Sequence, residues 1–161
     1  GAIADYTKAI EINPDFADAF INRGAAKDEL GDLQGAISDY TRAIEINPQN
    51  SIAYGNRGNA KSKLGDHQGA IADYTEAIEI NPQDSIAYGN RGTTKNELGD
   101  HQGAIADYTK ALKINPKDAN TYENRGIARE LANDLEGACR DWRKAADLGK
   151  ERSAEWVKNQ C

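Results

Sequence analysis

Polar residues that could carry chemistry recur along this chain at a constant spacing of 34 residues. The recurring set comprises Arg23, Arg57, Arg91, Arg125; Asp39, Asp73, Asp107, Asp141; and Asn22, Asn56, Asn90, Asn124. An active site brings different groups together at one place, whereas these groups are copied into every segment. We therefore predict that the chain is not an enzyme and that the recurring groups have structural or binding roles.

Motifs that would indicate a particular reaction do not occur in the sequence. It contains no glycine-rich phosphate loop, no His-Glu-x-x-His and no serine in a nucleophile-elbow context. His67 and His101 lie one repeat apart, where other repeats have Leu33 and Leu135. Structural zinc sites normally show four ligands with characteristic spacing. We interpret the histidines as solvent-facing turn residues and predict no catalytic residue, no metal and no cofactor.

The whole chain follows this internal repeat. Its four prolines are Pro14, Pro48, Pro82 and Pro116, and an Asn-Arg-Gly sequence recurs at the same interval. Residues 51–84 and 85–118 differ at only eight of their 34 positions. A repeat of this length is typical of proteins built by stacking small structural units.

Each repeat is predicted to form two helices. The first spans 17–30 in the first complete repeat, and Gly31 follows it as a residue suited to the left-handed end of a helix. Asp32 then caps the second helix, which ends at Asn47-Pro48 because a residue before proline avoids helical geometry. Its apolar residues are spaced to form a one-sided stripe. The corresponding helix-ending residues are Gly65, Gly99 and Asn133, and the corresponding caps are Asp66, Asp100 and Asp134.

This pattern resembles the tetratricopeptide repeat (TPR) of bacterial type. In the second complete repeat the family positions are Tyr54, Gly58, Ala70, Tyr74 and Pro82. The resemblance covers essentially the whole chain. It implies an all-α fold, a right-handed α-solenoid of stacked antiparallel helix pairs, in which neighbouring repeats supply the core that one repeat cannot form alone.

The register of the repeat divides the chain, which we interpret as a single domain of residues 1–161. The expected segments are the second helix of a truncated repeat (1–16), four repeats (17–50, 51–84, 85–118 and 119–148) and a C-terminal capping helix (149–161). Trp156 and Val157 are available to cover the C-terminal end of the array. No such cap precedes residues 1–16, which suggests a fragment of a longer array or a surface for self-association.

Two positions depart from the family pattern. Arg57 stands where leucine is usual, and Lys61 stands where tyrosine is usual. An arginine on the inner side of a helix is tolerated only when it is paired and hydrogen-bonded. We therefore predict that each repeated arginine pairs with the repeated aspartate of its own repeat, as Arg57 would with Asp73.

Cys139 and Cys161 are the only two cysteines. A helical hairpin that turns near Gly149-Lys150 would bring them close together, so a disulfide between them is possible. The alternative is a small buried thiol and a separate terminal one, since persistence of the bond depends on the compartment.

The resemblance also implies that the first helices line a concave groove that binds an extended peptide or a partner helix. The expected groove residues are Asn22, Asn56, Asn90, Asn124, Asn59, Thr93, Lys63 and Asn96. An amide side chain both donates and accepts, so it can pair with a peptide backbone of any sequence. The basic positions of the family's carboxylate clamp are occupied by Gly55, Asn120 and Asn124, which excludes that binding mode.

Overall charge and composition limit the partners. The chain has 20 basic and 26 acidic residues, a net charge of −6, which argues against binding to nucleic acid. It has no apolar run of the roughly 20 residues that a membrane span needs, so we predict no membrane insertion. We expect a neutral to basic protein or peptide partner. A self-associating scaffold, through the uncapped N-terminal helix, and an accessory domain of a larger protein remain as alternatives.

Overall fold

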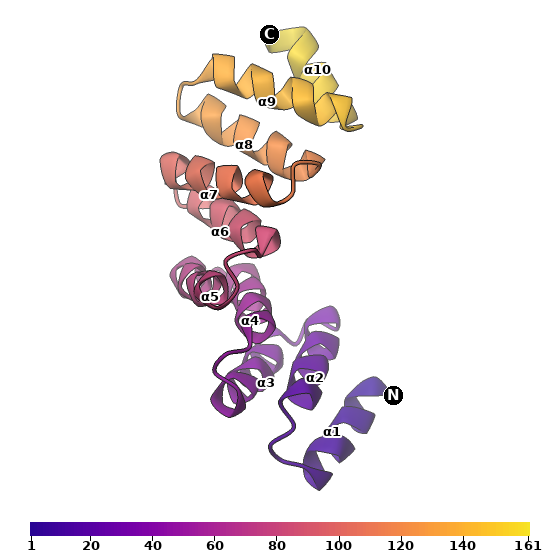
Figure 1. The fold of residues 1–161 in the computed structure, drawn as a ribbon. Helices are drawn as coiled ribbons and strands as arrows, with labels where there is room; N and C mark the ends of the chain where they lie inside the picture. The colour runs from indigo at the N-terminus through magenta and orange to yellow at the C-terminus, as the bar shows by residue number, and fades with distance from the viewer. The chain divides into compact units, whose positions relative to one another are not determined.

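The computed structural model describes residues 1–161 as ten α-helices joined by short turns (Figure 1). The helices are α1 (Ala2–Ile12), α2 (Ala17–Glu29), α3 (Leu33–Ile46), α4 (Ser51–Lys63), α5 (His67–Ile80), α6 (Ser85–Glu97), α7 (His101–Ile114), α8 (Ala119–Leu131), α9 (Leu135–Asp147) and α10 (Glu151–Gln160). The predicted all-α fold is confirmed. None of the helices combines the length and apolar character needed to span a bilayer.

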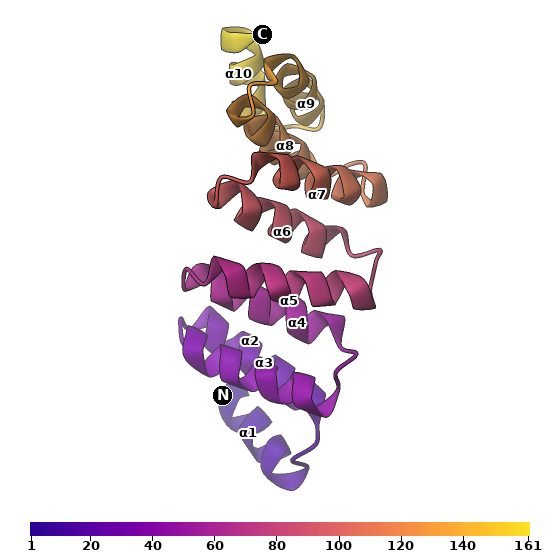
Figure 2. The same cartoon turned by 90° about the vertical axis from the view of Figure 1, so that its left-hand side faces the viewer.

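The helices belong to two compact units, Gly1–Pro82 and Gln83–Cys161. In the first unit α2 packs along α3, α4 packs along α5, and α3 also contacts α4. In the second unit α6 packs along α7, α8 packs along α9, and α10 covers α9. Figure 2 shows these helix pairs from the side. Each unit is thus a series of helix pairs in which consecutive helices are neighbours.

The ends of the helices follow the signals in the sequence. Gly31, Gly65 and Gly99 have φ angles of 82–83°, and Asn133 has 63°. These residues reverse the chain after the first helix of a pair, because glycine and asparagine tolerate the left-handed conformation. The side chain of Asp32 accepts a hydrogen bond from the Gly35 backbone nitrogen at 2.9 Å and caps α3. The aspartates at the equivalent positions of the other repeats cap α5, α7 and α9 in the same way.

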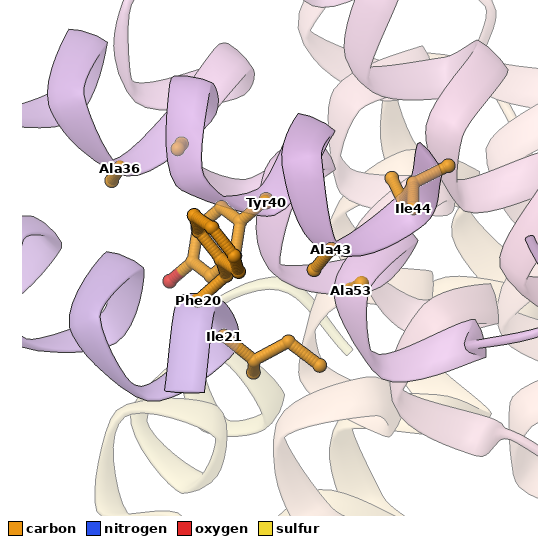
Figure 3. Close-up of a cluster of buried hydrophobic side chains, with 8 residues drawn as sticks. Phe20, Ile21, Ala36, Tyr40, Ala43, Ile44 and Ala53 are labelled. Carbon is orange, nitrogen blue, oxygen red and sulfur yellow. The ribbon is translucent and has the colours of Figure 1, made fainter. Parts of the chain in front are cut away.

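Small residues allow the helices of a pair to pack closely. In the first unit, Phe20, Tyr40, Ala36 and Ala43 belong to one buried cluster between α2, α3 and α4 (Figure 3). The ring of Tyr40 lies so close to Gly24 that a Cβ there would be only 2.8 Å from Tyr40 Cε1. The other helix pairs repeat this contact between a glycine and a ring, so the packing is specified separately in each repeat.

Candidate functional site

The repeated arginine and aspartate form a bidentate ion pair in every repeat. Arg57 donates from Nε to Asp73 Oδ2 at 2.9 Å and from Nη2 to Asp73 Oδ1 at 2.7 Å. The same two hydrogen bonds join Arg23 to Asp39, Arg91 to Asp107 and Arg125 to Asp141. The predicted pairing is therefore confirmed in each of the four repeats.

A second cation and an aromatic ring complete this ion pair. Lys61 Nζ lies 2.8 Å from Asp73 Oδ2, so the second departure from the family pattern has the same partner as the first. The guanidinium carbon of Arg57 lies 5.5 Å from the ring centre of Tyr54, a favourable cation–π distance. Arg57 Nη1 also donates to Thr41 Oγ1 at 3.1 Å, which links α4 to the preceding helix pair. The roles of the lysine and the threonine were not predicted, although both residues recur with the repeat.

These contacts show that the repeated carboxylates are structural groups. The side chain of Asp39 is only 5% exposed. Burial raises the pKa of Asp39, but hydrogen bonds from Arg23 and Lys27 outweigh burial and hold the pKa below its ordinary value. The hydrogen bond to Asp39 also raises the pKa of Arg23. Each repeated carboxylate is buried and is contacted by two cationic side chains, so it is poorly suited to bind a ligand.

In the first unit, several residues predicted for the groove are engaged by their own chain. Asn22 is exposed on α2, and Asn56 is half-buried on α4. Asn59 Oδ1 accepts a hydrogen bond from the Tyr74 hydroxyl at 2.7 Å. Lys63 Nζ contacts both carboxylate oxygens of Asp28 at 2.7 and 2.8 Å, joining the ends of α4 and α2. Asn59 and Lys63 thus have structural partners that the sequence did not reveal.

In the second unit, predicted groove residues surround one pocket. Asn90 and Thr93 on α6 and Asn124 on α8 line an open pocket of about 200 Å³, together with the ring of Tyr108. The Tyr108 hydroxyl lies 3.0 Å from Thr93 Oγ1. Asn96, further along α6, instead contacts His101 Nδ1 at 2.7 Å and is not among the lining residues.

The lining of this pocket is dominated by amide and hydroxyl groups. Asn120 and Asn124 contribute side-chain amides to the lining. Asp118 is the one carboxylate in the lining, and it caps α8 by accepting from Thr121 Oγ1 at 2.6 Å and from the Asn120 backbone nitrogen at 3.0 Å. The pocket therefore offers hydrogen bonds from neutral groups rather than a reactive centre.

The two histidines differ from their sequence interpretation. They are the first residues of α5 and α7 and are half-buried, whereas the sequence suggested solvent-facing turn residues. The reason in the second unit is the contact of His101 with Asn96, which holds the ring against the preceding helix. The structure brings together no group of three His, Cys, Asp or Glu residues that could hold a metal.

The C-terminal helix is held by a set of contacts that the sequence only partly indicated. Cys139 and Cys161 form a disulfide, with their Cα atoms 5.7 Å apart. The ring centres of Trp142 on α9 and Trp156 on α10 lie 5.1 Å apart. Glu123 of α8 is 4% exposed and accepts a hydrogen bond from Ser153 Oγ at 2.7 Å.

Arg152 completes this C-terminal set by donating to the other carboxylate oxygen of Glu123. Burial raises the pKa of Glu123, but the hydrogen bonds from Arg152 and Ser153 outweigh it and leave the pKa below its ordinary value. Glu123 interrupts the pattern of the repeat, since the equivalent positions hold Ile21, Gly55 and Gly89. This departure from the repeat was the sequence feature that could have indicated a specific role for Glu123.

The structure is a series of helix pairs of one repeating length. Each pair contains a contact between a glycine and a ring and an ion pair between arginine and aspartate. This architecture defines a helical-repeat protein of the interaction-scaffold class. Comparison with known families specifies this class. The tetratricopeptide repeat pattern matches residues 17–50, 51–84 and 85–118, and a TPR repeat pattern matches residues 1–27. The chain therefore belongs to the TPR family, whose fold is in general a non-enzymatic scaffold for protein interactions.

Solved structures agree with this assignment. The crystal structure of MamA is 26% identical, with a TM-score of 0.88, and the match covers 96% of this chain and 90% of that one. A second crystal structure of MamA protein, also 26% identical, gives a TM-score of 0.85 over 97% of this chain and 85% of that one. MamA 41-end from Desulfovibrio magneticus RS-1, at 19% identity, has a TM-score of 0.85 over 94% of this chain and 84% of that one, and supports the fold alone. No curated protein matches the sequence.

Proposed function

We propose that this chain is a non-enzymatic interaction module that binds an extended peptide or a partner helix through the pocket between α6 and α8. The observation that carries this proposal is the convergence of Asn90, Asn120 and Asn124 on one open pocket. Side-chain amides can pair with both the N–H and the C=O groups of a peptide backbone. The pocket also lies on the first helices of two consecutive pairs, the face that the family uses for ligands.

The expected partner is neutral to basic. The chain carries a net charge of −6, so its electrostatic field favours positively charged segments and disfavours acidic ones. Because the lining carries no basic side chain, an acidic peptide tail would find no cation to pair with.

The proposal is tested by an interaction screen with matched variants. Asn90→Ala/Asn124→Ala removes two lining amides, and Asn159→Ala removes an exposed amide on α10, outside the pocket. Partners captured by the wild type and by Asn159→Ala should be lost from the double variant, whose circular dichroism should remain unchanged. Equal capture by all three proteins would contradict binding in this pocket.

Self-association through the N-terminal helix is a second candidate. None of the residues of α1 is buried, and an open pocket of about 550 Å³ lies between α1 and α2, lined mainly by apolar atoms of Ile3, Ala26 and Leu30. Leu30 is 76% exposed. If this surface joins two copies, sedimentation should show a mass that increases with concentration, and Leu30→Lys should abolish the increase. A constant monomer mass would exclude this candidate.

A further inference from the structure

Two glycines in the middle of helices have no packing reason to be glycine. A glycine in a helix interior costs about 1 kcal/mol relative to alanine. At Gly92 that cost is explained, because a Cβ would lie 3.0 Å from Tyr108 Cε1. At Gly89, three residues earlier on the same helix, a Cβ would meet only Thr121 Oγ1 at 3.9 Å, and at Gly55 it would meet nothing within 4 Å.

The position of Gly89 is filled by a side chain in the first and fourth complete repeats. In the first complete repeat it is Ile21, which belongs to the buried cluster around Tyr40. In the fourth it is Glu123, which is covered by Arg152 and Ser153 of α10. At Gly89 the missing side chain leaves part of the 200 Å³ pocket between α6 and α8. The pocket is therefore open because this residue is glycine.

The groups around Gly89 favour a side chain that both donates and accepts hydrogen bonds. The Asp118 carboxylate already accepts hydrogen bonds from Thr121 and from the backbone of α8, and no basic side chain lines the pocket. An acidic side chain would therefore enter without a cationic partner and close to an existing negative charge, which is costly. A basic side chain could approach Asp118 but could not accept hydrogen bonds from the NH2 groups of Asn120 and Asn124. An apolar side chain would cover the amides of Asn120 and Asn124 without pairing them. A side-chain amide satisfies both conditions, because it donates and accepts without charge.

We propose that Gly89 opens a selectivity pocket that receives one asparagine or glutamine side chain of the bound polypeptide. This inference rests on the proposed function and deepens it, since the backbone-binding amides supply affinity while the pocket supplies preference for one residue. Asn120 is the polar group that recognises the incoming amide, and Gly89 provides the space for it.

The test uses a display library of random twelve-residue peptides, selected on the whole chain and on three variants. Gly89→Ile fills the pocket with the residue that stands at position 21. Gly55→Ile is the matched control, because it adds the same side chain at the equivalent position of α4, outside the pocket, where a Cβ meets nothing within 4 Å. Asn120→Ala removes the recognising amide without filling the pocket, so the proposal does not depend on correct folding of the isoleucine variant. Circular dichroism verifies the helix content of each protein.

Peptides enriched on the wild type and on Gly55→Ile should share Asn or Gln at one position. Changing that residue to Asp, Lys or Leu should weaken binding about tenfold, in line with the loss of one buried pairing. On Gly89→Ile and Asn120→Ala the preference should disappear while some binding to the backbone remains. The same preference on both variants, or selection of charged or apolar residues, would overturn the inference.

The outcome also separates the inference from the proposed function. If enriched peptides bind Asn90→Ala/Asn124→Ala as tightly as the wild type, the proposed function fails, whatever residue they share. If binding requires Asn90 and Asn124 but shows no preference at one position, the proposed function stands and the inference fails. A library that yields no enriched peptide overturns both.

Discussion

At the scale of single residues, Asp73 shows how a charged group is accommodated inside this protein. Its carboxylate is 5% exposed and is contacted by both Arg57 and Lys61 at 2.7–2.8 Å. Burial of an ion pair costs desolvation free energy, and the compensating attraction is lost when one partner is removed. Because Lys61 remains after loss of the arginine, the Asp73 carboxylate keeps part of the electrostatic attraction that offsets its desolvation.

Replacement of Arg57 by leucine should therefore destabilise the protein by about 3 kcal/mol, the lower end of the cost of breaking a buried pair. Arg57→Leu/Lys61→Leu/Asp73→Leu should recover most of this loss, because it removes the carboxylate together with both of its cationic partners. Urea denaturation followed by circular dichroism measures both effects. An unchanged midpoint for Arg57→Leu would show that the pair is not a structural element.

Protonation of Glu123 should loosen the C-terminal helix. The pKa of this carboxyl is lower in the folded protein than its ordinary value of 4.5, so its contribution to stability is fully present above pH 4.5. That contribution decreases as the pH falls from 4.5 through the folded pKa, because the unfolded chain then binds the proton more readily. Tryptophan fluorescence, which reports on Trp142 and Trp156, should change in this range.

Glu123→Gln is the control for the acid effect. This variant lacks the titrating group, so it should be less stable than the wild type at neutral pH and should lose less stability on acidification. An identical acid transition in both proteins would assign the pH dependence to other carboxylates, such as Asp39, whose pKa is also lowered.

At the scale of helices, α4 contains two interior glycines, of which one is tightly packed and the other faces open space. Gly58 lies against Tyr74, where a Cβ would be 2.8 Å from Cε1, and Gly55 faces open space. Tyr74 is 2% exposed, so its ring cannot move aside without disturbing the core.

Alanine should consequently stabilise α4 at position 55 and destabilise it at position 58. Gly55→Ala should gain up to about 1 kcal/mol from helix propensity. Gly58→Ala should lose roughly 1–3 kcal/mol, because overpacking displaces the ring. Thermal denaturation of the two variants provides a matched comparison, and changes of the same sign would contradict this account of the helix.

The attachment of α10 to α9 depends on a covalent link in addition to side-chain packing. Cys139 and Cys161 enclose a sequence separation of 22 residues. In the chain-entropy model, a loop of this length stabilises the folded state by about 3 kcal/mol.

Reduction of the disulfide should therefore lower the stability of the second unit by about 3 kcal/mol, and Cys139→Ala/Cys161→Ala should reproduce this loss without reductant. Thiol titration of the unfolded protein, with and without reductant, measures the state of the bond. Two free thiols in protein kept under oxidising conditions would favour the alternative of separate cysteines.

At the scale of the whole molecule, the net charge should influence the rate at which partners associate. The net charge of −6 attracts basic segments at long range, and salt screens this attraction. For a basic peptide selected by the library, the association rate should fall about tenfold between roughly 0.05 and 0.5 M salt. A neutral peptide of the same consensus is the control, and stopped-flow mixing provides the measurement. Equal salt dependence for both peptides would contradict steering by charge.

The sequence alone predicted the helices, their ends and the ion pairs with accuracy. Proline, glycine and aspartate act on the backbone within a few residues, so their positions determine where each helix starts and stops. The pairing of Arg57 with Asp73 was also predictable, because a repeated charge on an inner helix face requires a repeated partner. The division at 17–50, 51–84 and 85–118 remains the prediction made from the repeat, and the family comparison matches the same ranges.

The residues predicted for the groove could not all be assigned from the sequence. Asn59, Lys63 and Asn96 were predicted to line the groove, but each contacts a side chain of its own protein. The period of the repeat places residues on a face of a helix but does not reveal which side chains on neighbouring helices come within bonding distance.

The sequence by itself determined an array of helix pairs, since periodicity and local backbone preferences act along the chain. Only the tertiary structure decided which glycine packs against a ring and which one opens a pocket, and only it revealed that α10 covers Glu123. The reason is physical: hydrogen bonds and packing contacts depend on distances of a few ångströms between helices, and those distances arise only when the helices are assembled.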